Sequence, residues 1–129
     1  MQYMLLIHDD PSAWAGMSEE QVNAVMGEYF AYSAAIREEG ILVSGNPLKG
    51  REEARTVRVR DGKKVVADGP FAETKELIGG FALLEAASKE EAIRLGKEFM
   101  QIHVDILGQS YEGTLEVRPM FDPGGPDCS

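Results

Sequence analysis

Two segments of this chain are apolar at consecutive positions, and this pattern constrains the fold more than any other. A strand that is apolar only at alternate positions has one buried face, whereas a continuous apolar run indicates a strand buried on both faces. The first run lies within residues 1–7 and consists of Tyr3, Met4, Leu5, Leu6 and Ile7. The second lies within residues 77–86, where Ile78 and Leu84 share one parity and Phe81 and Leu83 share the other.

Each run is followed by a helix whose start is marked by a serine. Ser18 with Gln21, and Ser88 with Glu91, form capping boxes in which the serine and the residue three positions later satisfy backbone N–H groups. The first helix, which Gly40 ends, carries an apolar stripe of Val22, Val25, Met26, Tyr29, Ser33 and Ile36. The second helix carries Ala92, Gly96, Phe99, Met100, His103 and Leu107 on one face.

Further strands complete two strand–helix–strand units. Residues 41–43 are a strand candidate closed by residues 44–47, and residues 114–120 alternate as a strand does. Residues 54–68 predict a hairpin that turns at Asp61-Gly62. We therefore expect an α+β fold of the ferredoxin-like split βαβ type, with both helices on one face of an antiparallel sheet and an inserted β-hairpin. We expect one domain over residues 1–121 and a disordered tail over 122–129.

Two helices cover only one face of this sheet, so its second apolar face needs another cover. Burying a few hundred Å² at roughly 25 cal/mol per Å² is worth several kcal/mol, enough to drive association. We predict a homodimer with the two sheets face to face, closed by two-fold symmetry. The alternative is a longer loop of the same chain that folds back over that face.

Charge and composition exclude several classes of function. Thirteen basic and 22 acidic residues give a net charge of −9, which repels nucleic-acid phosphates and anionic membrane surfaces. The sequence has no apolar run of membrane-spanning length and no secretory signal pattern, so we expect a cytoplasmic protein. The single cysteine, Cys128, lies in a tail rich in proline and glycine, where it neither closes an internal disulfide nor serves as a rigid nucleophile.

The segment around Asp68 is the most unusual local sequence. Gly69-Pro70 fixes a turn, and the Asp68 carboxylate can cap the amides of that turn, which is the structural interpretation. The functional interpretation places Asp68 and Glu73 at the lip of a cavity, where burial near Phe71 raises the pKa of a carboxyl group toward the range useful for proton transfer.

Two histidines are candidate proton carriers. His8 shares the parity of Met4 and Leu6, and His103 lies on the apolar stripe of the second helix. For each, the alternative is a packed histidine with a structural role. His8-Asp9-Asp10 resembles part of a metal site, but adjacent strand residues alternate faces, so only two of the three converge and we expect no metal.

Charged side chains on the last strand and on the hairpin add two further candidates. Glu116 and Arg118 share one side of the last strand, where they pair with each other or Arg118 stabilises an anionic or enolate oxygen. Residues 49–64 hold seven basic and three acidic residues, a local charge of +4 that leaves −13 on the remainder. This basic face is solvated or meets the acidic body of a partner subunit.

Three segments together resemble a known family. They are Met1-Gln2-Tyr3-Met4-Leu5-Leu6-Ile7, Asp68-Gly69-Pro70-Phe71-Ala72-Glu73-Thr74-Lys75-Glu76 and Glu116-Val117-Arg118-Pro119. Over nearly the whole chain up to about Met120 the sequence resembles the DGPF-type branch of the YCII-related family. The resemblance implies the dimeric α+β barrel fold. In the broader family it implies a His-Asp pair as the active site and enzymes that act on aromatic ring compounds.

One departure from the family pattern bears on the site. The broader pattern has its histidine on the first helix, where this chain has Gly27-Glu28-Tyr29-Phe30. If the branch is catalytic, His8 or His103 substitutes, or Glu28 and Tyr29 carry the proton. Asp68 matches the motif of the branch itself. Some relatives of this branch are encoded beside alternative sigma factors, which favours an accessory regulatory role as the rival hypothesis.

We interpret the chain as a small homodimeric enzyme with no cofactor, an isomerase or lyase acting on a small aromatic or enolisable carbonyl compound. In this hypothesis Asp68 is the base or orienting group, His8 or His103 the second proton carrier, and Arg118 the anion stabiliser. The rival is a non-catalytic dimer that binds a small ligand or contacts a transcription partner, with a pocket lined mainly by apolar groups. A dimer without any ligand is the third alternative.

Overall fold

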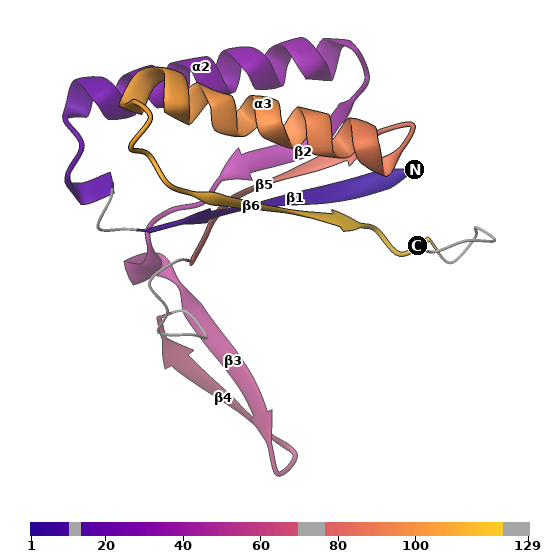
Figure 1. The fold of residues 1–129 in the computed structure, drawn as a ribbon. Coiled ribbons are helices and arrows are strands. Elements are labelled where there is room, and N and C mark those ends of the chain that lie inside the picture. The colour runs from indigo at the N-terminus through magenta and orange to yellow at the C-terminus, as the bar shows by residue number, and fades with distance from the viewer. Residues whose placement is uncertain (11–13, 70–76, 123–129) are drawn as a thin grey trace.

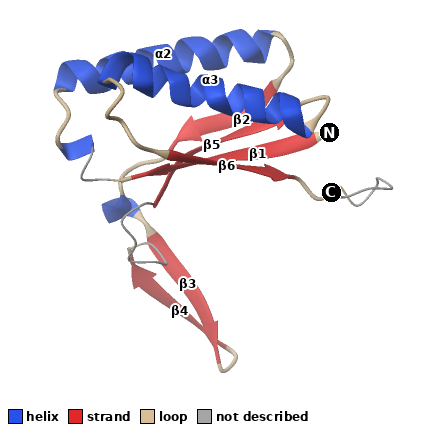
Figure 2. Cartoon of the chain, viewed as in Figure 1, coloured by secondary structure: helices blue, strands red, loops and turns tan. Residues whose placement is uncertain are grey.

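Four strands form one antiparallel sheet, and two long helices lie together on one of its faces (Figures 1 and 2). The computed structural model describes residues 1–10, 14–69 and 77–122. The sheet consists of β1 (Gln2–Asp9), β2 (Leu42–Pro47), β5 (Leu77–Glu85) and β6 (Thr114–Pro119). The helices are α2 (Glu19–Glu38) and α3 (Lys89–Leu107). Between β2 and β5 lie a short 3-10 helix η1 (Arg51–Glu53) and the strands β3 (Arg55–Arg60) and β4 (Lys63–Asp68).

The strand order β2-β5-β1-β6 confirms the expected fold class. In this order β5 separates β1 from β2, and β1 separates β5 from β6, so each strand–helix–strand unit is split by a strand of the other. The two continuous apolar runs, β1 and β5, therefore occupy the centre of the sheet. β2 and β6 are the edge strands.

Both helix starts are capped by the predicted serines. The Ser18 hydroxyl accepts from the Gln21 N–H at 3.1 Å, and the Gln21 side chain accepts from the Ser18 N–H at 3.0 Å. The Ser88 hydroxyl accepts from the Glu91 N–H at 3.2 Å, but the Glu91 carboxylate accepts from the Ala87 N–H at 2.9 Å. In this second box the glutamate side chain accepts from the residue before the serine cap and not from the serine itself. Two backbone N–H groups at the start of α3 are still satisfied.

The core lies between the helices and the inner face of the sheet. On β1 the inward side chains are those of Tyr3, Leu5 and Ile7. Leu5 and Ile7 share a buried cluster with Leu95 and Phe99 of α3, whereas Tyr3 belongs to a second cluster with Ala86 and Ala92. The Phe99 ring lies 5.6 Å from that of Tyr29 and 4.8 Å from that of Tyr32, so aromatic contacts hold α3 against α2.

The opposite face of the sheet, which we call the outer sheet face, carries the side chains at the alternate positions of the central strands. Cross-strand register places Met4 opposite Leu83 and Leu6 opposite Phe81, with all four side chains half-buried. The outer sheet face includes Met4, Leu6, His8, Ile78, Phe81, Leu83, Glu116 and Arg118. Both long helices lie on the other side (Figure 1), so the described parts of the chain leave this apolar row without a covering helix.

Two local features differ from the sequence prediction. β2 runs through the residues expected to close it, because Ser44, Gly45 and Asn46 continue to pair with β5. The register of β1 against β5 shifts between Ile7 and His8, so that Ile7 pairs with Gly80 and His8 with Ile78. Gly79 is the extra residue, and the bulge turns Ile78 away from the parity of Leu84 onto the outer sheet face.

Gly45 marks a close approach between β2 and β5, and its replacement is expected to be costly. A Cβ built there lies 2.8 Å from the Phe81 carbonyl oxygen and 3.1 Å from the Ala82 Cα, both backbone atoms of β5. We expect Gly45→Ala to lower the free energy of unfolding by about 1–3 kcal/mol. Gly27 is the matched control, because it is exposed on α2 with nothing within 4 Å of its Cβ position. Gly27→Ala is expected to stabilise by up to about 1 kcal/mol. Urea unfolding of both variants checks this, and equal midpoints would contradict it.

In the described residues, no helix is both long and apolar enough to cross a membrane.

Candidate functional site

The two candidate histidines lie on opposite faces of the sheet. His8 is on the outer sheet face, half-buried at the end of β1. His103 is on the inner side, on the face of α3 that packs against the core, and is only 4% exposed. The sheet therefore separates them, and they belong to two different candidate sites.

The outer sheet face brings His8, Glu116 and Arg118 together. His8 Nε2 lies 3.5 Å from Glu116 Oε1, and Arg118 Nε lies 4.0 Å from Glu116 Oε2. The pairing of Glu116 with Arg118 is the structural alternative that the sequence left open. The three groups lie at the solvent-accessible rim of the apolar row, where ion pairs contribute little to stability.

Asp68 lies in the hairpin rather than beside either histidine. Its carboxylate is 91% exposed, and Oδ1 lies 3.2 Å from Arg55 Nε on the opposite strand. The backbone N–H of Gly69 donates to the Ala54 carbonyl at 2.8 Å, which closes the base of the hairpin. No described histidine contacts Asp68. Glu73 and Phe71 lie outside the described residues.

His103 is held in an aromatic enclosure. Its ring stacks on Tyr111 with a centroid distance of 5.1 Å and an angle of 19°, and it meets Trp14 edge-on at 6.4 Å. Its Nδ1 lies 3.1 Å from the Phe99 carbonyl oxygen, one turn earlier on α3. A neutral ring that donates Nδ1–H to this carbonyl keeps its lone pair on Nε2.

The protonation of His103 follows from its burial. Loss of hydration lowers the pKa of His103 below the ordinary value of 6.5, while the Phe99 carbonyl and the Asp9 carboxylate oppose this in part. The imidazole is therefore neutral at pH 7. Asp9 is close enough to stabilise the imidazolium if the ring takes up a proton.

A small cavity of about 30 Å³ joins these groups between the sheet and both helices. His103 and Asp9 line it together with Tyr29, and its remaining lining residues are Ile7, Trp14, Val25, Met26, Pro47, Gly79 and Gly80. Burial raises the pKa of the Tyr29 phenol above its ordinary value of 10.0, so this group is a hydrogen-bond donor at neutral pH. The cavity has about the volume of one water molecule, so a larger molecule enters only if lining side chains such as half-buried Trp14 move.

The lowered pKa of His103 predicts a specific pH dependence of stability. Between the folded pKa and 6.5 the unfolded chain binds more protons at this position than the folded chain, so stability falls as the pH drops through that window. His103→Asn keeps a donor for Phe99 and removes the titration. We expect the unfolding free energy of the unmodified protein to fall more steeply than that of His103→Asn between about pH 7.5 and 5.5. Urea unfolding at several pH values measures both curves, and parallel curves would contradict the assignment.

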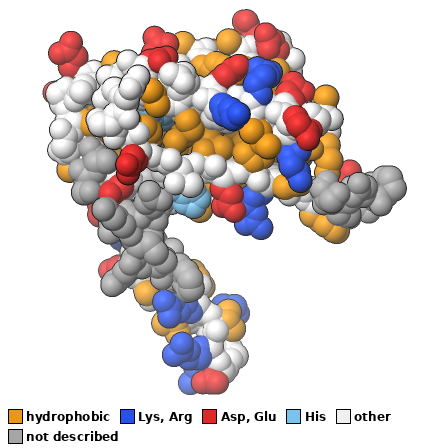
Figure 3. Space-filling view, viewed as in Figure 1, with side chains coloured by type: hydrophobic (Ala, Val, Ile, Leu, Met, Phe, Trp, Pro, Cys, Tyr) orange, Lys and Arg blue, Asp and Glu red, His pale blue; other side chains and the backbone are white. Residues whose placement is uncertain are grey.

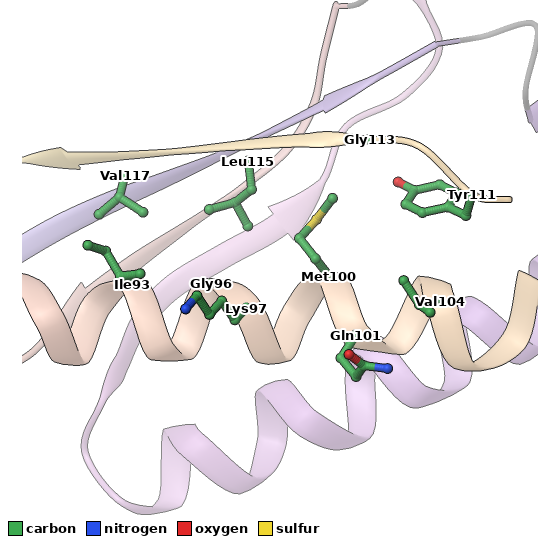
Figure 4. Close-up of a pocket in the computed structure, with 10 residues that line it drawn as sticks. All are labelled: Ile93, Gly96, Lys97, Met100, Gln101, Val104, Tyr111, Gly113, Leu115 and Val117. Carbon is green, nitrogen blue, oxygen red and sulfur yellow. The ribbon is translucent and has the colours of Figure 1, made fainter. Parts of the chain in front are cut away.

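A larger apolar groove of about 440 Å³ lies between α3 and β6 (Figure 4). Leu115 and Val117 point from β6 toward α3, while Ile93 and Met100 point back toward β6. Gly96 brings the two elements close, because a Cβ there would lie 2.9 Å from Leu115 Cδ2. The other lining residues are Lys97, Gln101, Val104, Tyr111 and Gly113. Figure 3 shows this strip as a band of hydrophobic side chains with basic side chains at its edge.

Sequence reasoning missed three residues around His103. Asp9 was considered only as a metal ligand, although it shares the inward parity of Ile7, and that parity was the available signal. The Asp9 side chain also lies against Gly79, and a Cβ at position 79 would collide with the Asp9 carboxylate. Trp14 lies in a short helical turn before α2, and Tyr111 lies in the loop between α3 and β6. Both segments are too short for periodicity to give a signal. Among the described residues, no group of three His, Cys, Asp or Glu side chains converges as a metal site requires.

Comparison with known proteins gives two matches. A family model described as the YCII-related domain matches residues 1–115. An uncharacterised protein of Rhizobium meliloti (strain 1021) is 33% identical over 126 residues, which cover 96% of this chain and 97% of that protein. The family match includes β1, both helices and the first residues of β6, so it covers every element that lines the small cavity.

Proposed function

The chain belongs to the YCII-related domain family, and on that premise we propose that it is a homodimeric acid–base enzyme without a cofactor of its own. Its reaction is an isomerisation or elimination on a small enolisable carbonyl or aromatic compound. The observation that carries the proposal is a buried, neutral His103 that lines one cavity together with Asp9 and Tyr29.

The three groups support complementary steps of proton transfer. His103 Nε2 takes the proton from a carbon next to the substrate carbonyl, and the C–H electron pair forms the enolate. The Asp9 carboxylate stabilises the imidazolium that results. The Tyr29 hydroxyl donates to the enolate oxygen, where negative charge develops. The imidazolium then returns the proton to another carbon, or the enolate expels a leaving group and the proton follows it.

The dimer in this proposal is supported by the outer sheet face. Met4, Leu6, Phe81 and Leu83 form a continuous half-buried apolar row, and Ile78 is exposed beside it. A second copy placed over this row would remove it from water and enclose His8, Glu116 and Arg118. Arg118 stays a proposed anion-binding group in that enclosure, where His8 is the rival to His103 as proton carrier. The alternative cover is a longer loop of the same chain.

Asp68 keeps a narrower proposed role. Its exposure and its ion pair with Arg55 favour a structural role at the base of the hairpin, through a contact other than the predicted cap of the turn amides. Membership of the DGPF-type branch remains a proposal that rests on residues 68–76.

Deuterium incorporation tests the proposal without knowledge of the natural substrate. The protein is incubated in D₂O with a panel of small lactones, β-keto acids and phenolic carbonyl compounds, and NMR follows the loss of each α-proton signal. We expect at least one compound to exchange well above the rate in buffer. If every compound in the panel exchanged at the buffer rate, the proposal of acid–base catalysis would fail.

The groove between α3 and β6 favours a second candidate function, the binding of a small ligand without catalysis. Its walls are mainly apolar, no histidine is among the described residues that line it, and the exposed Lys97 gives its edge a positive charge. An amphipathic carboxylate suits this combination of apolar walls and one cation. In the same panel, compounds that shift the Met100 and Leu115 methyl signals without exchange would favour this binding role.

A further inference from the structure

The β3–β4 hairpin stands clear of the rest of the molecule (Figure 1). Within the described part of the chain its strands pair only with each other, and they form a separate two-stranded sheet. Every residue of β4 is exposed, as is every residue of β3 except Thr56. The turn at Asp61 and Gly62 has the positive φ angles of 53° and 75° that a tight hairpin requires.

The hairpin has two chemically different faces. Register places Val57 opposite Val66, and Val59 opposite Lys64 on the same face, which we call the valine face after its three valines. The other face carries Arg58 opposite Val65, and Arg60 opposite Lys63. Figure 3 shows hydrophobic and basic side chains side by side along the hairpin.

This hairpin lacks the packing contacts that normally stabilise a two-stranded β-hairpin. Isolated hairpins are marginally stable in water, and they need a further strand or a packing partner for their apolar face. Val57, Val59 and Val66 are all more than half exposed, so in a single chain the described residues give this face no partner. Exposed valines on a long strand pair are also an aggregation hazard unless a specific surface covers them.

Charge identifies the partner that suits the hairpin. Five basic and two acidic side chains give residues 55–68 a net charge of +3, so the remainder of the same chain carries −12. A second copy therefore offers the acidic surface that the hairpin complements. The direction of the hairpin is also consistent with a second copy as the partner. The hairpin extends from the sheet on the side opposite the helices, which is the side of the outer sheet face (Figure 2).

We propose that the hairpin is an intersubunit arm whose valine face packs on a second copy of this chain while its basic residues meet that copy's acidic surface. The inference rests on the homodimer of the proposed function. It adds a second contact region, distinct from the outer sheet face. By two-fold symmetry each dimer has two such arms, so one substitution acts twice.

Two neighbouring valines allow a matched test. Val66 lies on the valine face and is 66% exposed, whereas Val65 lies on the opposite face and is 52% exposed. Val66→Asp and Val65→Asp make the same chemical change in the same strand. We expect Val66→Asp to raise the dimer dissociation constant by at least ~30-fold, and Val65→Asp by less than ~3-fold, since only the first buries an unpaired carboxylate in each arm. Sedimentation equilibrium measures both constants.

Each outcome decides one of the claims. If the unmodified protein is dimeric and both variants weaken the dimer equally or not at all, the arm is overturned while the dimer stands. If the unmodified protein is a monomer, both the proposed dimer and the arm are overturned.

A basic two-stranded ribbon also fits a DNA groove. Binding of a labelled DNA duplex at physiological ionic strength that Val66→Asp abolishes would therefore overturn the arm in favour of a nucleic-acid contact.

Discussion

His103→Asn is expected to slow enzyme-catalysed deuterium exchange by roughly 10²–10⁴-fold, the range over which a positioned general base contributes. The asparagine amide can still donate to the Phe99 carbonyl, 3.1 Å from Nδ1 in the unmodified protein. It has no basic nitrogen to accept the α-proton. Folding and the binding of the compound should therefore survive while proton abstraction is lost. NMR exchange rates at pH 7, with unfolding curves to verify that the variant is folded, measure this effect.

His8→Asn is the matched control on the other face of the sheet. His8 contacts Glu116 on the outer sheet face and does not line the cavity with Asp9 and Tyr29. We expect this variant to change the exchange rate by less than about threefold, because the base and the oxyanion donor are untouched. The reverse pattern, with His8→Asn inactive and His103→Asn active, would move the catalytic site to the outer sheet face.

Phe81→Asp is expected to make the protein monomeric at micromolar concentration. Phe81 lies at the centre of the outer sheet face, between Asn46 and Leu6 in the cross-strand register. Losing its burial costs roughly 1.5–3 kcal/mol, and a desolvated carboxylate costs several more. Two-fold symmetry applies these costs twice, so the dissociation constant should rise by at least ~10³-fold. Size-exclusion chromatography with light scattering measures the change.

Phe30→Asp is the matched control for this substitution. Phe30 is 52% exposed on α2, within the helical layer on the other side of the sheet. The same replacement there should leave the dissociation constant within about threefold, since no partner surface is expected over α2. Equal weakening by both variants would indicate a general loss of stability. Retention of the dimer in Phe81→Asp would show that another surface holds it.

Local sequence signals were sufficient to predict most of the fold. Serine caps fixed the starts of both helices, and Asp61-Gly62 fixed the hairpin turn, because these features depend on neighbouring residues alone. Alternation also separated the faces of β1, with Leu5 and Ile7 inside and Leu6 and His8 on the outer sheet face. The two doubly apolar runs are strands, as predicted, and the structure places both at the centre of the sheet.

Features that depend on how two strands pair could not be predicted from the sequence of either strand alone. The bulge at Gly79 is a property of β5 against β1, so parity along β5 alone assigned Ile78 to the wrong face. The extension of β2 through Asn46 depends on hydrogen bonds to β5 that outweigh the turn propensity of Gly45 and Asn46.

The candidate site was predicted only in part. His103 and Tyr29 were both considered from the sequence, but their shared cavity with Asp9 depends on how α2, α3 and the end of β1 meet. Asp68 was favoured for its unusual turn, but its carboxylate is 91% exposed and pairs with Arg55 in the hairpin, away from either histidine. Glu73 stays a prediction, since it lies outside the described residues.

A second copy of the chain over the outer sheet face is the central claim, because the proposed enclosure of Arg118 and the intersubunit arm both depend on it. Sedimentation equilibrium of the unmodified protein at micromolar concentration measures it most directly. The predicted result is a single species with twice the 14.1 kDa mass of one chain. A mass of 14.1 kDa that persists as the concentration rises would contradict it, and the apolar row of Met4, Leu6, Phe81 and Leu83 would then need a cover from its own chain.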